Sequence, residues 1–439
     1  MKTQKIFIIG LSWMCFLGSI LPMALCKVFA ATSAKTLEEC FQSALQKSEV
    51  IGSQKELLIQ AREKYWLALS TALPQINGIG SYLWQESSAT TDNTGTVSSS
   101  PSRQPLAKIQ ATQPLFHGFK EFIGLRGANK TVQGAQEDYN QSVLDLYKQV
   151  AAAYYSVLSL EQDDHNLATE LKLYDNRTKD LKARTRIGRS RSSEVLSVES
   201  AMASVRANQE NTRGQILAMR ESLAFLTGFS SEVELQDSSQ PFAAEKIGSV
   251  DSYLTAVKSR PDYRSQYAKW KVADDSVWIA WTGHIPYLDF TGDYYLKRTG
   301  PSKDIHWDAQ IILTVPLFSG GQTQSNIRTA QSQLRQAQLS LLQTERAAVQ
   351  EIRTLYIQLK SSAQQETALA EATQLAEKSY KEQTHQYNLG LVTNLDVLNS
   401  LSSFQDSQTA WDRAKFSVKL NKVKLDLATS SKWSDRGPS

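Results

Sequence analysis

The chain has few cysteines and prolines, and their positions restrict the possible folds. Two of its three cysteines, Cys15 and Cys26, lie in the first 30 residues, so removal of that segment would leave Cys40 alone and exclude an intrachain disulfide. None of the eleven prolines falls within 115–240 or 317–437. Because proline breaks helices, these two stretches can form very long helices, and stability must come from packing and assembly.

The residues expected of an enzyme or a nucleic-acid-binding protein are also missing. The five histidines do not stand at metal-ligand spacing from another histidine, cysteine or acid. The segment 163–165, Asp-Asp-His, lies in a polar run where we expect exposed helix surface. The sequence contains no phosphate loop, nucleophile elbow or pair of catalytic acids, which argues against an exported enzyme on an irregular helical fold. The formal charge of +4 hardly constrains the partners. Because it has no catalytic motif and no cluster of Lys and Arg with interleaved aromatics, the sequence predicts no catalytic residue, no cofactor and no nucleic-acid partner.

The first 30 residues have the pattern of a secretion signal. Two lysines precede an apolar run over 6–25, and 28–30 supplies small residues at the positions that a signal peptidase reads. An uncleaved anchor helix and lipid attachment at Cys26 are the alternatives. Leu25 stands where a lipoprotein signal needs a small residue, so we expect an exported protein without that lipid.

The most informative feature is a duplication. Residues 113–118 (QPLFHG) return 202 residues later as 315–320 (VPLFSG), and Gly188 returns as Gly390 at the same shift. Upstream the shift becomes 212, because the first copy has a longer loop after Trp84. An unbroken register of this length indicates a duplicated structural unit. We therefore predict a signal peptide (1–30), a first repeat (31–230), a linker (231–250), a second repeat (251–430) and a short tail (431–439).

Each repeat contains long segments with apolar residues at alternating spacings of three and four. The clearest series are Val143, Leu146, Val150, Ala153, Val157 and Leu160 in the first copy, and Ile327, Ala330, Leu334, Ala337 and Leu341 in the second. A seven-residue period sustained this long favours coiled-coil packing of helices, each up to about 90 Å long. We expect these helices to reverse near Gly188 and Gly390, since glycine accepts the left-handed backbone of a tight turn.

Four runs of period two lie between the helical stretches. They predict strands at about 75–86 and 105–116 in the first repeat, and at about 286–298 and 305–318 in the second. The residues that mark their boundaries are Pro74, Pro114, Gly118, Pro286, Pro316 and Gly320. In 287–296, Leu, Phe and Tyr on one face alternate with Asp and Thr on the other.

Strands of this length and pattern fit a membrane barrel, although a small soluble sheet would show the same alternation. Four strands cannot close a barrel, and each unpaired backbone group at an open edge in lipid costs several kcal/mol. A membrane sheet therefore requires several copies: two copies would supply about eight strands and three about twelve.

The order and spacing of these features resemble the TolC-like outer-membrane efflux family over roughly 36–430. The residues that carry the resemblance are the helix openings 37–44 and 253–256, the strand entries 73–74 (Leu-Pro) and 285–286 (Ile-Pro), the two Pro-Leu-Phe-x-Gly strand exits, and the segment 387–398. The resemblance implies a mainly α fold with membrane β structure, in which a homotrimer forms a twelve-stranded β-barrel and a periplasmic α-helical tunnel. It also implies a passive exit duct in the outer membrane of a Gram-negative bacterium, for tripartite efflux or type I secretion. Its partners would be outer-membrane lipid, a periplasmic adaptor (membrane fusion) protein and an inner-membrane pump of the RND, ABC or MFS type.

The resemblance further places functional residues at the end of the tunnel far from the membrane. By position, the adaptor contact falls on Gly390, Leu391, Val392 and Thr393 and on Gly188, Arg189 and Ser190; turn formation alone is the alternative for both glycines. Asp396, Asn399 and Glu194 fall at the resting aperture, which acidic residues often ring in this family. Asn399 departs from the pair of aspartates in some members, and Asp396 would otherwise be an ordinary solvated helix residue.

Four arginines crowd the first reversal: Arg184, Arg186, Arg189 and Arg191. They form either an adaptor-facing charge cluster or a solvated hairpin tip. The competing interpretation of the whole chain is a soluble periplasmic coiled-coil adaptor or scaffold, which needs no lipid-facing strands.

Overall fold

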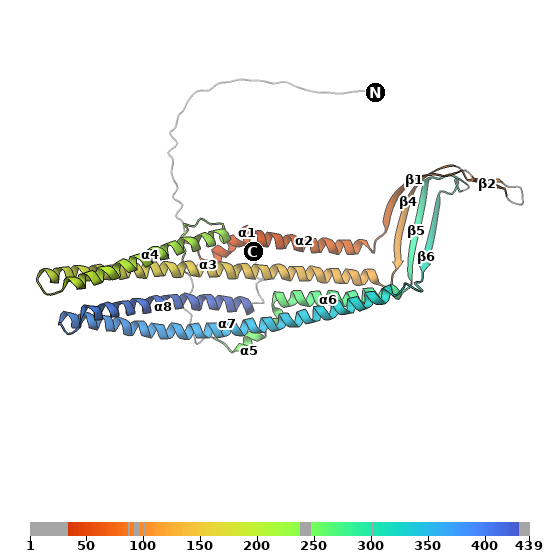
Figure 1. Cartoon of the computed structure of the whole chain (residues 1–439). Helices are drawn as coiled ribbons and strands as arrows, with labels where there is room; N and C mark the ends of the chain where they lie inside the picture. The colour runs from red at the N-terminus through yellow and green to blue at the C-terminus, as the bar shows by residue number, and fades with distance from the viewer. Residues whose placement is uncertain are drawn as a thin grey trace, which may run out of the picture.

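The protein is elongated, with long helices at one end and a β-sheet at the other (Figure 1). The computed structural model describes residues 34–86, 88–91, 97–100, 102–237, 247–300 and 302–429. The predicted signal peptide, Cys26 and the tail 431–439 lie outside the described residues, as does part of the predicted linker.

The two halves of the chain repeat one order of elements. The first half contains α1 (Leu37–Lys47), α2 (Glu49–Ser70), β1 (Gln75–Trp84), β2 (Ser88–Thr91), β3 (Val97–Ser100), β4 (Arg103–Phe116), α3 (Lys120–Arg186) and α4 (Ser192–Thr227). The second half contains α5 (Val250–Leu254), η2 (Val257–Ser259), α6 (Pro261–Trp281), η3 (Thr282–His284), β5 (Tyr287–Lys297), β6 (Trp307–Thr314), α7 (Gln322–Asn388) and α8 (Asn394–Thr429). Helices α3 and α7 each contain 67 residues, which gives each a length of about 100 Å.

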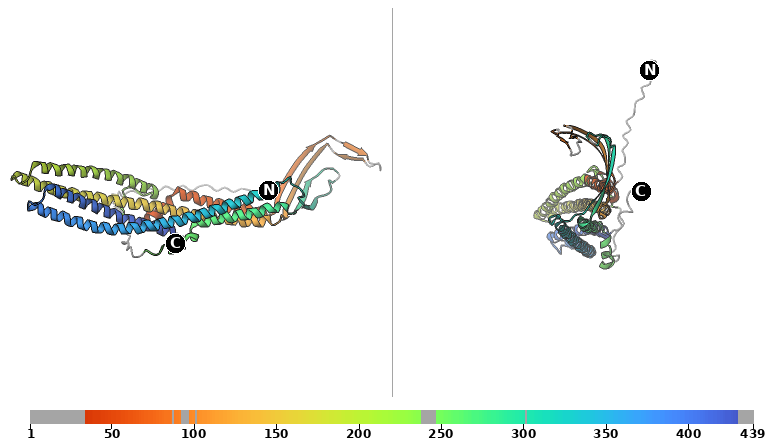
Figure 2. Two further views of the ribbon diagram at one scale, coloured as in Figure 1. Left: turned by 60° about the horizontal axis from the view of Figure 1, so that its bottom comes forward. Right: turned by 90° about the vertical axis from the view of Figure 1, so that its right-hand side faces the viewer.

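The long helices pack as the apolar spacing predicts. On α3, Val143, Leu146, Val150, Ala153 and Val157 are buried. In the second copy, Ile327 and Ala330 are buried and the later members of the series are half-buried. Near the sheet the helices lie in the order α2, α3, α6, α7, and near the far end in the order α4, α3, α8, α7 (Figure 2).

The sheet has four antiparallel strands in the order β1-β4-β5-β6. Strand β4 of the first repeat pairs with β5 of the second, so β1 and β6 are the two edges. Strand β6 ends at Thr314, earlier than the predicted 318, because its ladder with β5 ends at the pair Tyr287–Thr314, where β5 begins. The ribbon of β2 and β3 in the Ser/Thr-rich loop was not predicted.

The boundary residues have different local roles. Pro74 and Pro286 each come directly before a strand, whereas Pro114 lies inside β4 next to a register shift. Gly118 and Gly320 have positive φ values of 63° and 61°. Only Gly118 is also held by a close approach, since a Cβ there would lie 2.9 Å from an Ile285 side-chain carbon.

The register gives the sheet one apolar and one polar face. On one face Leu288 pairs with Leu313 and Phe290 with Ile311, while on the other Asp293 pairs with Asp308. The apolar face is bare: Ile311 and Leu313 are each 64 % exposed. A small soluble sheet would cover that face with its helices, and here all the long helices extend away from the sheet (Figure 1). Among the described helices, none is long and apolar enough to cross a membrane.

The expectation that 163–165 is exposed was wrong for Asp163. Its side chain is 3 % exposed, and its carboxylate accepts hydrogen bonds from the Arg413 Nε of α8 at 3.0 and 3.2 Å. Burial raises the pKa of Asp163, and Arg413 only partly offsets that effect. The partner stands 250 residues away in sequence, so no local pattern reveals the pair.

Candidate functional site at the helix tips

The two helix reversals lie together at the end of the molecule opposite the sheet (Figure 1). The turn after α3 contains Gly188, with φ 75°, and the turn after α7 contains Gly390, with φ 78°. A Cβ at either position would meet no atom within 4 Å, so the backbone conformation alone explains each glycine. We call 187–191 the first tip and 389–393 the second tip.

Hydrogen bonds join the two helical hairpins next to the tips. The hydroxyl of Tyr387 donates to Glu194 Oε2 at 3.1 Å, and the hydroxyl of Ser190 donates to the same oxygen at 2.6 Å. Arg184 Nη2 donates to Asn388 Oδ1 at 2.7 Å. These contacts hold the start of α4 and the end of α3 against the end of α7.

Arg177 forms the centre of this junction. Its Nε donates to Asn394 Oδ1 at 3.0 Å, and its guanidinium lies 3.9 Å from the ring centroid of Tyr387. Burial lowers the pKa of Arg177, partly offset by Tyr387 and Asp180, but a guanidinium stays charged in a protein. Its Nη2 is buried and has no hydrogen-bond partner within the described chain. A cation stacked on a ring in this way contributes about 0.5–2 kcal/mol to the tip contact.

Asp396 lies in the first turn of α8 and caps that helix together with Thr393. Its Oδ2 accepts from the Thr393 backbone N–H at 2.8 Å and from the Thr393 hydroxyl at 2.6 Å, while the Asp396 N–H donates back to the Thr393 hydroxyl at 3.3 Å. This reciprocal pair satisfies N–H groups that the first helical turn leaves free. The Thr393 hydrogen bonds lower the pKa of Asp396, so this exposed carboxylate is ionised at neutral pH. Asn399 is exposed one turn further along α8.

A groove of about 640 Å³ lies between the two tips. Of the residues expected to contact an adaptor, it is lined by Arg189, Gly390, Val392 and Thr393; Gly188, Ser190 and Leu391 are their chain neighbours. Glu194, expected at the aperture, also lines this groove, whereas Asp396 lies at the helix start beside it.

Sequence reasoning missed Arg177 and Tyr387. The signal for Tyr387 is its place on the apolar stripe of α7, seven residues after Tyr380 and on the same helix face.

A second polar cluster lies on the polar face of the sheet. Lys108 Nζ of β4 lies 2.7 Å from Asp293 Oδ2 of β5, and the hydroxyl of Tyr295 donates to Asp308 Oδ2 of β6 at 3.0 Å. Arg298 completes the cluster at 3.7 Å from Asp308. A polar face of this kind suits a water-filled interior.

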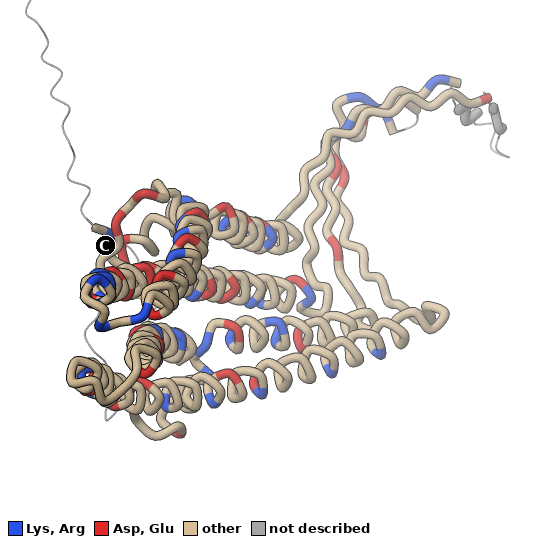
Figure 3. The backbone as a smooth tube through the Cα atoms, turned by 60° about the vertical axis from the view of Figure 1, so that its left-hand side comes forward, with Lys and Arg blue, Asp and Glu red and all other residues tan. Residues whose placement is uncertain are grey.

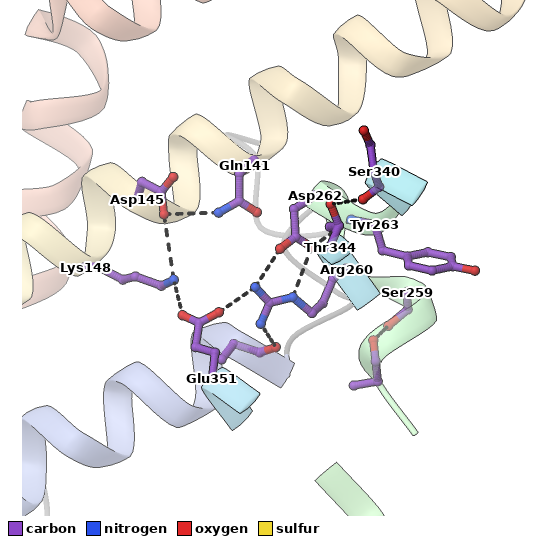
Figure 4. A network of polar contacts seen from close by, with 12 residues as sticks. Gln141, Asp145, Lys148, Ser259, Arg260, Asp262, Tyr263, Ser340, Thr344 and Glu351 are labelled. Atoms are coloured by element: carbon purple, nitrogen blue, oxygen red, sulfur yellow. Dashed lines mark hydrogen bonds and ion pairs between the residues drawn. The ribbon is translucent and has the colours of Figure 1, made fainter. Parts of the chain in front are cut away.

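A network of ion pairs fixes the middle of the molecule (Figure 4). Arg260, buried just before α6, contacts Asp262 at 2.7 Å and Glu351 of α7 at 2.6 Å, and donates to the carbonyl oxygen of Ala428 at 3.1 Å. Lys148 of α3 lies 3.2 Å from the same Glu351. Burial alone would raise the pKa of Glu351, but Arg260 and Lys148 outweigh it and hold that pKa below its usual value.

Two segments, 40–229 and 253–430, match the sequence model of the family described as outer membrane efflux protein. The chain belongs to this family. Each matched segment falls within one of the two predicted repeats. The outer membrane protein TolC of Vibrio cholerae is 22 % identical over 416 residues, covering 92 % of this chain and 93 % of that protein. Among solved structures, CusC superposes with a TM-score of 0.78 at 16 % identity, covering 91 % of this chain and 92 % of CusC. VceC of Vibrio cholerae superposes with 0.77 at 18 % identity, covering 90 % and 95 %.

Family membership confirms the predicted fold, function and location. The fold is that of TolC-like channels, with long helices and a few strands. The chain is a channel protein for efflux and not an enzyme, and it belongs to the outer membrane of a Gram-negative bacterium. Channels of this kind work as trimers with an adaptor and an inner-membrane pump.

Proposed function

We propose that three copies of this chain close a twelve-stranded barrel and a helical tunnel, which serves as the passive exit duct of a tripartite efflux or type I secretion system. A periplasmic adaptor and an inner-membrane pump of the RND, ABC or MFS type would supply docking and energy. The observation that carries this proposal is that both the sheet and the helical layer of the protomer end in two unpaired edges.

The sheet supplies the first pair of edges. Strands β1 and β6 have partners on one side only, and the bare apolar face is suited to lipid. Unpaired backbone groups at those edges would cost several kcal/mol each in a bilayer. Pairing β1 of one copy with β6 of the next removes the cost, and three copies of four strands match a small membrane barrel.

The helices supply the second pair. Helices α2 and α4 form one edge of the helical layer and α7 forms the other. Large apolar side chains are exposed on these edge helices: Val50, Leu57, Trp66, Leu67, Leu196, Leu217, Phe225, Leu339, Leu342, Ile357 and Leu375. Full burial of one such side chain contributes about 1.5–3 kcal/mol, so a second copy on each edge would be strongly stabilised.

The tip contacts support a closed resting state. Tyr387, Glu194 and Arg177 hold the α7–α8 hairpin against the α3–α4 hairpin, and opening the tunnel would require these contacts to break. At the aperture we place Asp396, Asn399 and Glu194, of which Asp396 is the exposed carboxylate. Three copies of Asp396 around an axis would repel by only about 1 kcal/mol per pair in water, little enough for a closed ring to tolerate.

The experiment is a disulfide cross-link across the proposed β1–β6 seam. In a Cys40→Ser background, Gly78→Cys on β1 is combined in turn with Ala309→Cys, Ile311→Cys and Leu313→Cys on β6. At least one pair should give covalent dimers and trimers on oxidation of the membrane-embedded protein. As a control, cysteines at the paired positions Ala111 and Gly292 should cross-link within one chain. Monomers alone from all three seam pairs, with the control formed, would contradict the proposal.

A further inference from the structure

The two tips of the duplicated unit differ in charge. At the shift of 202 residues, Arg189 corresponds to Leu391 and Arg191 to Thr393. The first tip is therefore basic and the second is uncharged, as the blue segments at the α3–α4 turn show (Figure 3). The two turns are built alike, with φ values of 75° and 78° at the glycines and the equivalent backbone hydrogen bonds from Arg189 to Arg184 and from Leu391 to Gln386. Turn formation therefore does not require the arginines.

The basic side chains at the groove are not used within the protomer. Arg189 and Arg191 are exposed and line the groove, and neither side chain makes an ion pair or hydrogen bond within the described part of the chain. Arg184, in contrast, is held by Asp180 at 3.0 Å and by Asn388. Glu194, the carboxylate lining the groove, already accepts from Tyr387 and Ser190. The guanidinium groups of Arg189 and Arg191 are therefore available to bind another molecule.

The second tip and the start of α8 give the groove exposed apolar side chains. Leu389 and Leu395 line it and are each 62 % exposed, and Val392, which also lines it, lies between them in sequence. A free inorganic anion would use the arginines but would leave these side chains in water. The combination fits a helical peptide segment that presents a carboxylate beside an apolar side chain.

We propose that the groove between the two tips takes an amphipathic helical segment of the adaptor that carries an acidic residue, and that Arg189 and Arg191 select this partner. The inference rests on the proposed function, which provides the adaptor. A guanidinium binds a carboxylate through two parallel hydrogen bonds, which gives directional selection that an apolar wall lacks. Arg189 and Arg191 are thus specificity-determining residues of the docking surface.

The test uses three synthetic amphipathic helices that share one leucine stripe and differ at a single polar position, which is Glu, Gln or Lys. Each fluorescent peptide is titrated with the detergent-solubilised full channel, and binding is followed by anisotropy. The wild-type channel should bind the Glu peptide on the order of tenfold more tightly than the Gln peptide, and the Lys peptide least tightly. The preference should shrink between 50 and 300 mM NaCl, where the screening length falls below about 10 Å.

Matched variants test which arginines cause the preference for the Glu peptide. Arg189→Gln and Arg191→Gln should each reduce the Glu preference, and the double variant should bring it below about twofold. Arg186, the last residue of α3, directly precedes the first tip but does not line the groove, so Arg186→Gln removes the same charge and should retain the preference. Equal binding of the Glu and Gln peptides, no binding of any peptide, or an equal loss in Arg186→Gln would overturn the inference.

The same preparation separates this inference from the proposed function. Its oligomeric mass and its conductance in planar bilayers are measured alongside the titration. A conducting trimer without the Glu preference would contradict only the role of the arginines. A non-conducting monomer would contradict the proposed duct itself.

Discussion

Asp396 combines a helix cap with an exposed negative charge, and two substitutions separate these roles. Asp396→Asn keeps an oxygen that can accept from Thr393 but removes the charge, whereas Asp396→Ala removes both. In planar bilayers both variants should lose cation preference, and only Asp396→Ala should also lower the melting temperature. A wild-type cation preference in Asp396→Asn would exclude Asp396 from the aperture.

The pH dependence of this effect follows from the direction of the pKa shift. Thr393 lowers the pKa of Asp396, so the folded carboxylate stays ionised below the unfolded pKa of roughly 3.9. The cap therefore stabilises the helix above that pH and is lost as the pH falls through the folded pKa. Cation preference should be constant from pH 8 to 5 and should disappear only in stronger acid.

Tyr387 connects the two hairpins through its hydroxyl and its ring separately. Tyr387→Phe removes the hydrogen bond to Glu194 but keeps the ring under Arg177. A hydrogen bond to a charged group is worth about 1.5–3 kcal/mol, and about 1.4 kcal/mol shifts an equilibrium tenfold. The variant should therefore open at least several-fold more often in single-channel recordings. Tyr387→Ala should open more often still, and an unchanged open probability in Tyr387→Phe would contradict the closing role of this contact.

At the scale of elements, a half-buried acid, Glu170, weakens the contact between α3 and α8. Burial, and to a lesser extent Asp406 of α8, raise the pKa of Glu170 to about 7, although the Tyr174 hydroxyl partly stabilises its charge. Because the folded pKa lies above the unfolded value of roughly 4.3, the folded state binds the extra proton between these pH values. Stability should therefore fall as the pH rises from about 4.5 to above 7.

Glu170→Gln should remove this pH dependence. At pH 8 it should stabilise the helical region by about 2 kcal/mol, after allowance for partial solvent exposure, and at pH 4 it should have little effect. The measurement is the urea midpoint by circular dichroism at both pH values. Glu210→Gln on the exposed side of α4 is the control and should leave both midpoints unchanged. An equal shift at both pH values would contradict the cause given for the pKa.

Arg260 links α6, α7 and the end of α8 in the middle of the molecule. Arg260→Met should lower the free energy of unfolding by about 2–4 kcal/mol, because it leaves Glu351 without its main buried partner. Arg264→Gln breaks an exposed pair with Glu137 and should cost less than about 1 kcal/mol. Since the folded pKa of Glu351 is depressed, the Arg260 contribution is complete above roughly pH 4.3 and is lost as the pH falls further. Equal urea midpoints for the two variants at pH 7 would contradict this ranking.

The sequence reveals the elements better than the contacts between them. Periodicity and the 202-residue shift are local or repeated signals, so they place the long helices and both glycine turns. Strand ends are less certain from sequence, since pairing across the ladder decides where β6 stops. The tip contacts join residues far apart in the chain: Tyr387 meets Glu194 across 193 positions and Arg177 meets Asn394 across 217. No local pattern encodes such pairs, so the structure was needed to find them.

At the scale of the whole molecule, the duplication gives the protomer two similar edges that a ring can join. The sheet ends in β1 and β6, and the helical layer ends in α2 with α4 on one side and α7 on the other. The two tips, however, have diverged from each other, one basic and one apolar. A ring of three copies would therefore alternate two kinds of tip at its end opposite the barrel, and a docking surface there would have threefold rather than sixfold chemistry.

The most direct measurement is the oligomeric mass of the detergent-extracted mature protein by native mass spectrometry. Three copies supply the twelve strands that close the barrel, so the predicted result is a trimer that resists dilution. A stable monomer would leave β1 and β6 as open edges in the membrane and would contradict the duct.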